Sequence, residues 1–72
     1  MTARTNIGRR MEILVALLEN EARSGRGLGV MGVAEAVGRE KSLVSRALAA
    51  LHRDGLVQRD PDPAYSRRLM AG

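Results

Sequence analysis

The side chains most able to bind another molecule are concentrated between residues 41 and 55. At about 100° per residue, a helix through this stretch places polar or small residues on one side: Ser42, Arg46, Ala49 and Arg53, with Ser45 at the edge. Hydroxyls and guanidinium groups bond phosphate oxygens or base edges, and a small residue lets the helix backbone come close. Most polar helix faces are merely solvated, but this one suits the major groove of duplex DNA.

The other side of the same stretch is apolar. Val44, Ala47, Leu48 and Leu51 recur at the i, i+3, i+4 and i+7 positions, which share one face of a helix. Gly55 stands where a left-handed C-cap ends a helix. The spacing therefore predicts a helix over 41–54 that is anchored by its apolar side and presents its polar side outward.

Residues for catalysis or metal binding are scarce. His52 is the only histidine and there is no cysteine, so neither a zinc site nor a Cys-His pair can be built. His52 falls between the apolar and outward faces, and Asp54 and the carboxylates of the first helix form no pair on a shared face. We expect no enzyme activity, no metal and no cofactor.

Length and charge narrow the class of partner. The 72 residues suffice for one small domain, and its 12 Lys+Arg against 8 Asp+Glu give a net charge of +4. A basic balance dominated by arginine favours a polyanionic partner, although ordinary solubility also explains it. Tyr65 is the only aromatic residue, which argues against the stacking platforms of single-strand and RNA-binding modules.

The remaining composition indicates where such a protein works. The absence of cysteine fits a reducing cytoplasm. The longest apolar run, Ile13–Leu18, is too short to span a bilayer, and the first residues hold no apolar signal segment. We expect a cytoplasmic protein without membrane contact.

A first helix is predicted over residues 6–24, after a flexible arm at 1–5. Thr5 or Asn6 supplies its cap. Its apolar stripe would consist of Ile7, Met11, Leu14, Val15, Leu18 and Ala22. Ile13 and Leu17 flank this stripe and either widen the core face or contact a partner.

A glycine-rich loop and a short helix follow. The glycines in the loop 23–29 fit no phosphate-binding motif and are interpreted as turn residues that interrupt the helix. The next helix spans 31–38, with Val30, Val33, Ala34 and Val37 as its apolar face. Gly38 ends it and residues 39–41 turn into the helix at 41–54, so the order is that of a helix-turn-helix.

The last segment predicts a β-hairpin at 56–69. Leu56–Arg59 forms one strand, Asp60–Pro63 the turn, and Ala64–Leu69 the returning strand, with Tyr65 and Leu69 on one face. Three helices plus this wing give a mainly α fold, a winged helix-turn-helix, as a single domain over 1–72. Arg59, Arg67 and Arg68 on the wing either contact phosphates or are solvated.

The chain resembles the N-terminal domain of the IclR-type (isocitrate lyase regulator) transcription factors. Residues 10–18 and 33–38 match its first two helices. The most specific part is Lys-Ser-x-Val-Ser-Arg-x-Leu-x-x-Leu at 41–51 with Asp-Gly-Leu-Val at 54–57. The likeness extends from about residue 9 to 69, and MarR-like winged helices share the Ser-Arg-x-Leu-x-x-Leu and Gly-Leu-Val elements.

The resemblance implies homodimers on operator DNA and a C-terminal effector-sensing domain, which is absent from this chain. It also implies that Ser42, Ser45 and Arg46 face the DNA and that Lys41 lies near a phosphate. Because the sequence ends just after the wing, we expect an excised domain of a longer regulator rather than a small stand-alone protein.

Four departures from the family pattern stand out. Leu43 replaces a common threonine or serine, which loses a hydrogen bond but still allows contact with a thymine methyl. Arg39 and Glu40 replace a frequent Leu-Pro. Pro63 stands where the wing tip usually has glycine. The returning strand is spaced two residues longer than usual, and Arg67 lies on its Tyr65/Leu69 face.

Sequence-specific binding of double-stranded DNA by a transcriptional regulator is the predicted function, with helix 41–54 in the major groove and the wing on the backbone. The alternative is a winged helix that binds another protein instead of DNA. The expected DNA contacts are Lys41, Ser42, Leu43, Ser45, Arg46, Ala49, Arg53, Arg59, Arg67 and Arg68.

Overall fold

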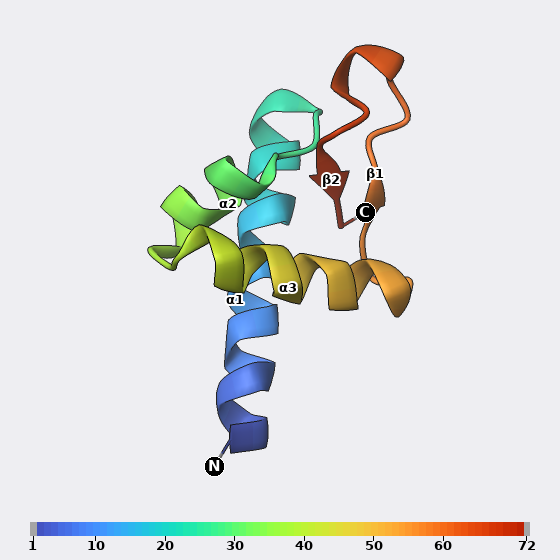
Figure 1. Cartoon of the computed structure of the whole chain (residues 1–72). Helices are drawn as coiled ribbons and strands as arrows, with labels where there is room; N and C mark the ends of the chain where they lie inside the picture. The colour runs from blue at the N-terminus through green and yellow to red at the C-terminus, as the bar shows by residue number, and fades with distance from the viewer. Residues whose placement is uncertain (1, 72) are drawn as a thin grey trace.

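The computed structural model describes residues 2–71, which form three helices followed by a small antiparallel hairpin (Figure 1). The elements are α1 (Thr2–Ser24), α2 (Val30–Val37), α3 (Lys41–Arg53), β1 (Gln58–Arg59), the 3-10 helix η1 (Pro63–Tyr65) and β2 (Leu69–Met70). This is the winged helix-turn-helix predicted from the sequence. Within residues 2–71, no helix has both the length and the apolar character needed to cross a membrane.

The apolar side of α3 packs against the other two helices, as its spacing predicts. Val44, Leu48 and Leu51 are buried, and Ala47 is half-buried beside them. They meet side chains from α1, α2 and the segment before β1: Ile13, Leu17, Val33 and Val57. Burying a side chain of this size stabilises a fold by about 1.5–3 kcal/mol, so this contact fixes the rotation of α3 about its axis.

The predicted apolar stripe of α1 is wrong in part. Ile13 and Leu17 are fully buried, whereas Met11, Val15 and Leu18 are 56%, 46% and 50% exposed. Both α2 and α3 pack on the side of Ile13 and Leu17, and at about 100° per residue the three exposed side chains point the opposite way.

Other members of that stripe have mixed outcomes. Ala22 is exposed and Leu14 is half-buried against the core, while the side chain of Ile7 lies outside the described part of the chain. The arm expected over residues 1–5 is also wrong for its described residues, because α1 begins at Thr2. Neither glycine nor proline occurs between Thr2 and Asn6 to stop the helix.

The hairpin is shorter than predicted. Gln58 pairs with Met70 and Arg59 with Leu69, so the returning strand is Leu69–Met70 and the prediction of a strand over 64–69 is wrong. Residues 63–65 form η1 instead, because Asp62 accepts a hydrogen bond from the Ala64 N–H at 2.9 Å and Pro63 fixes a helical backbone angle.

A third backbone segment joins this hairpin. Leu28, in the loop between α1 and α2, exchanges two hydrogen bonds of 3.0 and 2.9 Å with Leu69. The loop therefore lies along the edge of β2 that β1 leaves open. The sequence predicted only that its glycines form turns. The wing is thus attached to the helical part of the fold by main-chain bonds.

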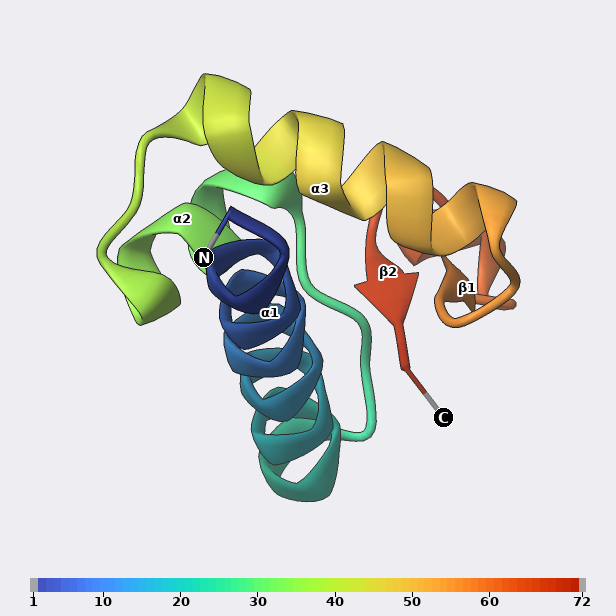
Figure 2. The ribbon, with the colours of Figure 1, turned by 90° about the horizontal axis from the view of Figure 1, so that it is seen from below.

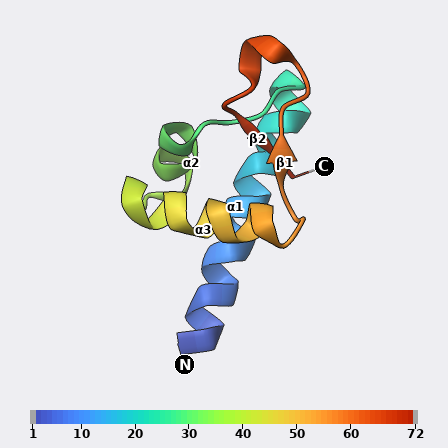
Figure 3. The same cartoon turned by 45° about the vertical axis from the view of Figure 1, so that its right-hand side comes forward.

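All other elements lie on one side of α3. Figure 2 shows α3 along the edge of the molecule, with α1, α2 and the strands beneath it. α1 crosses behind α3 and its N-terminal half continues past it, away from the wing (Figures 1 and 3). One long face of α3 is therefore uncovered, between the start of α1 and the wing.

The turn between α2 and α3 depends on Gly38. This residue caps α2 with left-handed angles, φ 67° and ψ 36°, and the N–H of Arg39 bonds Ala34 O at 3.1 Å. The Arg39 side chain, which replaces the family's usual leucine, lies 3.4 Å from a carboxylate oxygen of Glu12 in an exposed ion pair. The turn is therefore shaped by the backbone of Gly38, and an exposed ion pair links it to α1.

We expect Gly38→Ala to lower the free energy of unfolding by about 1–2 kcal/mol, because an added Cβ disfavours left-handed angles. No atom lies within 4 Å of that Cβ, so backbone conformation alone carries the cost. Gly8→Ala, within α1 and equally free of contacts, should instead stabilise by about 0.5–1 kcal/mol. Urea unfolding measures both; equal effects of the two substitutions would contradict this account of the turn.

Candidate nucleic-acid interface

The uncovered face of α3 carries the polar residues singled out from the sequence. Ser42, Ser45, Arg46, Ala49 and Arg53 are all exposed. Their exposure follows from the packing of the opposite face of α3 against the core. The helix thus presents two hydroxyls, two guanidinium groups and one small side chain to solvent.

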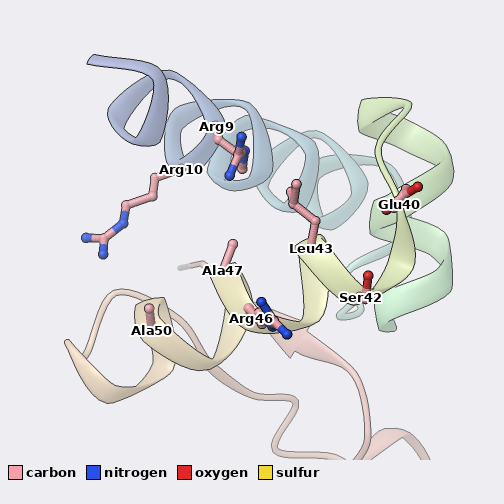
Figure 4. Close-up of a pocket in the computed structure, with 8 residues that line it drawn as sticks. All are labelled: Arg9, Arg10, Glu40, Ser42, Leu43, Arg46, Ala47 and Ala50. Atoms are coloured by element: carbon pink, nitrogen blue, oxygen red, sulfur yellow. The ribbon is translucent and has the colours of Figure 1, made fainter. Parts of the chain in front are cut away.

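A hollow of about 440 Å³ borders this face on the side of α1 (Figure 4). Its lining comes from the N-terminal half of α1, the residue before α3 and α3 itself: Arg9, Arg10, Glu40, Ser42, Leu43, Arg46, Ala47 and Ala50. We call it the α1 hollow. Three arginines against one carboxylate give its lining a net positive charge.

A second hollow borders the same face on the side of the wing. It is lined by residues of α3, of the hairpin and of the start of α2: Val30, Ser45, Leu48, Ala49, His52, Arg59, Ser66, Arg67 and Leu69. We call it the wing hollow. Arg59 and Arg67 of the wing line the same hollow as Ser45 and Ala49 of α3, although they are distant from α3 in sequence.

The remaining predicted contact residues are placed differently. Leu43 is half-buried in the α1 hollow rather than fully outward. Lys41 and Arg53 are exposed at the two ends of α3 and line neither hollow. Arg68 is exposed with its guanidinium carbon 4.9 Å from the centre of the Tyr65 ring, a cation–π distance.

Arg9 and Arg10 are the residues that sequence reasoning missed. Neither was expected at the site, but both line the α1 hollow. Arg10 Nη1 lies 3.4 Å from Asp54 Oδ2. Arg9 Nε is buried and has no hydrogen-bond partner among the described residues. The signal for these two was their adjacency in a basic chain, which alone does not place them beside α3.

Asp60 positions the wing. Its carboxylate is buried, with 5% exposed, and accepts hydrogen bonds from the N–H groups of Gly27 at 2.8 Å and Asp62 at 2.9 Å. These two bonds are the main reason that its pKa lies below the ordinary 3.8, and the nearby Arg26 and Arg68 add to the lowering. The aspartate expected only as a turn residue is one of the links between the wing and the α1–α2 loop.

The close approach of that loop requires a glycine. A Cβ on Gly27 would lie 2.9 Å from Leu69 O and 3.0 Å from Arg68 Cβ, closer than the backbone of the wing permits. Arg26 beside it pairs with Asp62 at 3.1 Å and lies 4.9 Å from the Tyr65 ring centre. The position of the wing relative to α3 is therefore set by several bonds to the loop.

Comparison with protein families matches residues 9–61 to the IclR helix-turn-helix domain. The match runs from Arg9 in α1 through α2, α3 and β1 and stops just before η1, where the wing departs from the expected hairpin. Neither the curated proteins nor the solved structures yield a match.

Acid should weaken the attachment of the wing. Because the pKa of Asp60 is lower in the folded chain, its stabilising effect is complete above 3.8 and is lost as pH falls through the lower folded value. In urea unfolding, Asp60→Asn should therefore be less stable than wild type at neutral pH, with the gap shrinking on acidification.

The matched control is Asp54→Asn, which removes an exposed carboxylate whose ion-pair partner among the described residues is Arg10 at 3.4 Å. Its effect on the free energy of unfolding should be small, as for most surface ion pairs. A stability gap between wild type and Asp60→Asn that stays constant with pH would refute the role assigned to this carboxylate.

Proposed function

The chain belongs to the IclR helix-turn-helix domain family of DNA-binding transcription regulators, and from this premise we propose that α3 reads a specific duplex sequence in the major groove. The observation that supports this most is the uncovered face of α3, with every other element packed on the opposite side (Figure 2). A helix with side chains is about 10–12 Å across, and the major groove is about 12 Å wide.

Each residue of the face has a proposed role. Arg46, at the middle of α3, makes a bidentate contact with a guanine edge or bonds a nearby phosphate. Ser42 and Ser45 bond backbone oxygens and set the register. Ala49 leaves room for the helix to approach the bases, and Leu43 meets a thymine methyl from the edge of the α1 hollow.

The outer cations supply affinity that does not depend on sequence. Lys41 and Arg53 at the ends of α3, with Arg59, Arg67 and Arg68 on the wing, are proposed to contact phosphates and to release counterions. The exposure of all five and the position of Arg59 and Arg67 around the wing hollow support this assignment.

We further propose that two copies bind together in the cytoplasm. A two-fold dimer would read half-sites related by symmetry, about 34–36 Å apart or a multiple of that spacing. Two copies also double the number of phosphate contacts, which raises both affinity and salt dependence. Small helix-turn-helix domains commonly reach their operators this way.

Arg46→Ala should weaken binding to the preferred duplex, selected from a random pool, by about 5- to 150-fold, which corresponds to about 1–3 kcal/mol for one bidentate base contact. Binding to unrelated duplexes should change less. Fluorescence anisotropy over a series of salt concentrations measures both.

Arg23→Ala is the matched control, because Arg23 is exposed on α1 and lines a different hollow from Arg9 and Arg46, one that also includes Met11 and Val15. It should leave both affinities nearly unchanged. Equal binding of wild type and Arg46→Ala at every salt concentration would show that Arg46 is wrongly assigned. A wild-type chain that binds no duplex at low salt would favour the protein-binding alternative.

A further inference from the structure

We propose that the α1 hollow is a second phosphate site, in which Arg9, assisted by Arg10, holds the DNA strand on the side of the groove away from the wing. This inference rests on the proposed function, because it requires α3 to lie in the major groove. It assigns to α1 a direct contact with DNA in addition to its role as a support for α3.

The first support is the unpartnered donor of Arg9. Its Nε is buried and has no hydrogen-bond partner among the described residues. A buried donor without a partner is costly, and more so when it belongs to a charged group. Figure 4 shows the Arg9 guanidinium between α1 and α3, beside Leu43. An oxyanion in the hollow would supply the missing acceptor.

The second support is the charge and floor of the hollow. The lining includes three arginines, Arg9, Arg10 and Arg46, and one carboxylate, Glu40. Leu43, Ala47 and Ala50 provide an apolar floor, and charges act more strongly where water is partly excluded. The volume of about 440 Å³ leaves ample room for one phosphate group. The lining therefore suits an anion with several acceptor oxygens.

The third support is position. The α1 hollow and the wing hollow border α3 on opposite sides, with α1 running past α3 away from the wing (Figures 1 and 3). A helix in the major groove has the phosphates of one strand on each side. The wing arginines can reach one strand, and among the residues whose side chains the structure describes Arg9 and Arg10 are placed to reach the other.

Arg10 is available to assist, because its existing partner holds it weakly. The ion pair with Asp54 is 3.4 Å long, and the two side chains are 43% and 47% exposed. Exposed pairs of this kind contribute little, so a phosphate can displace or share Asp54. Arg9 has no such competing partner among the described residues and is therefore the principal ligand.

The test compares Arg9→Met with Arg23→Met, an equal loss of charge on α1 outside the α1 hollow. Binding of each variant to the selected duplex and to a random duplex is measured over a salt series. For Arg9→Met, the slope of log K against log salt should fall by about 0.9 for each bound copy, equally on both duplexes. Arg9→Lys should restore the slope, and Arg23→Met should leave it unchanged.

A neutral-backbone scan locates the contact. Each phosphate of the selected duplex is replaced in turn by an uncharged methylphosphonate. One replacement, on the strand away from the wing, should weaken wild type yet leave Arg9→Met unaffected. If every replacement weakens both proteins equally, Arg9 contacts no phosphate and the proposal fails.

Further outcomes distinguish a free anion from a DNA phosphate, and failure of the α1 site from failure of the proposed function. If inorganic phosphate alone shifts the Arg9 Nε–Hε resonance to saturation while the duplex does not, the hollow binds a free anion and the DNA contact is refuted. If wild type binds duplex with strong salt dependence but Arg9→Met has the same slope, the α1 site fails while the proposed function stands. A wild type that binds no duplex overturns both.

Discussion

The burial of Val44, Leu48 and Leu51 against Ile13, Leu17 and Val33 is the contact on which the rest of the structure depends. It fixes the rotation of α3 about its own axis, and that rotation decides which side chains meet solvent. A quarter turn of the helix about its axis would bury an arginine and expose a leucine. The free-energy cost would exceed the small stability that a chain of 72 residues can have. The polar face points outward because the apolar face of α3 packs against α1 and α2.

The wing obeys a different kind of constraint, made of hydrogen bonds rather than apolar burial. Its strands are two residues each, too short to hold a position alone. The carboxylate of Asp60 and the bridge from Leu28 to Leu69 tie them to the α1–α2 loop. The position of Arg59 and Arg67 relative to α3 therefore depends on a buried acid and on the glycine that lets the loop approach.

Sequence alone predicted α2, α3 and the outward face, because a strict apolar period bounded by glycine has one interpretation. It failed for α1, where apolar residues occupy most of the circumference, so the period could not say that Ile13 rather than Val15 faces the core. It failed for the returning strand because Asp62 and Pro63 favour a 3-10 turn locally. The hollow around Arg9 could not be predicted from the sequence, because it forms only where α1 and α3 cross in the folded chain.

The most direct test of the central claim is to map the bound surface by NMR, titrating the ¹⁵N-labelled chain with a duplex selected from a random pool. The account predicts that the largest amide shifts fall in α3 between Ser42 and Ala49, while residues 17–24 of α1 stay nearly unchanged. Shifts concentrated around Met11 and Val15, with α3 unaffected, would contradict it. In that case the uncovered face of α3 would not be the surface that meets DNA.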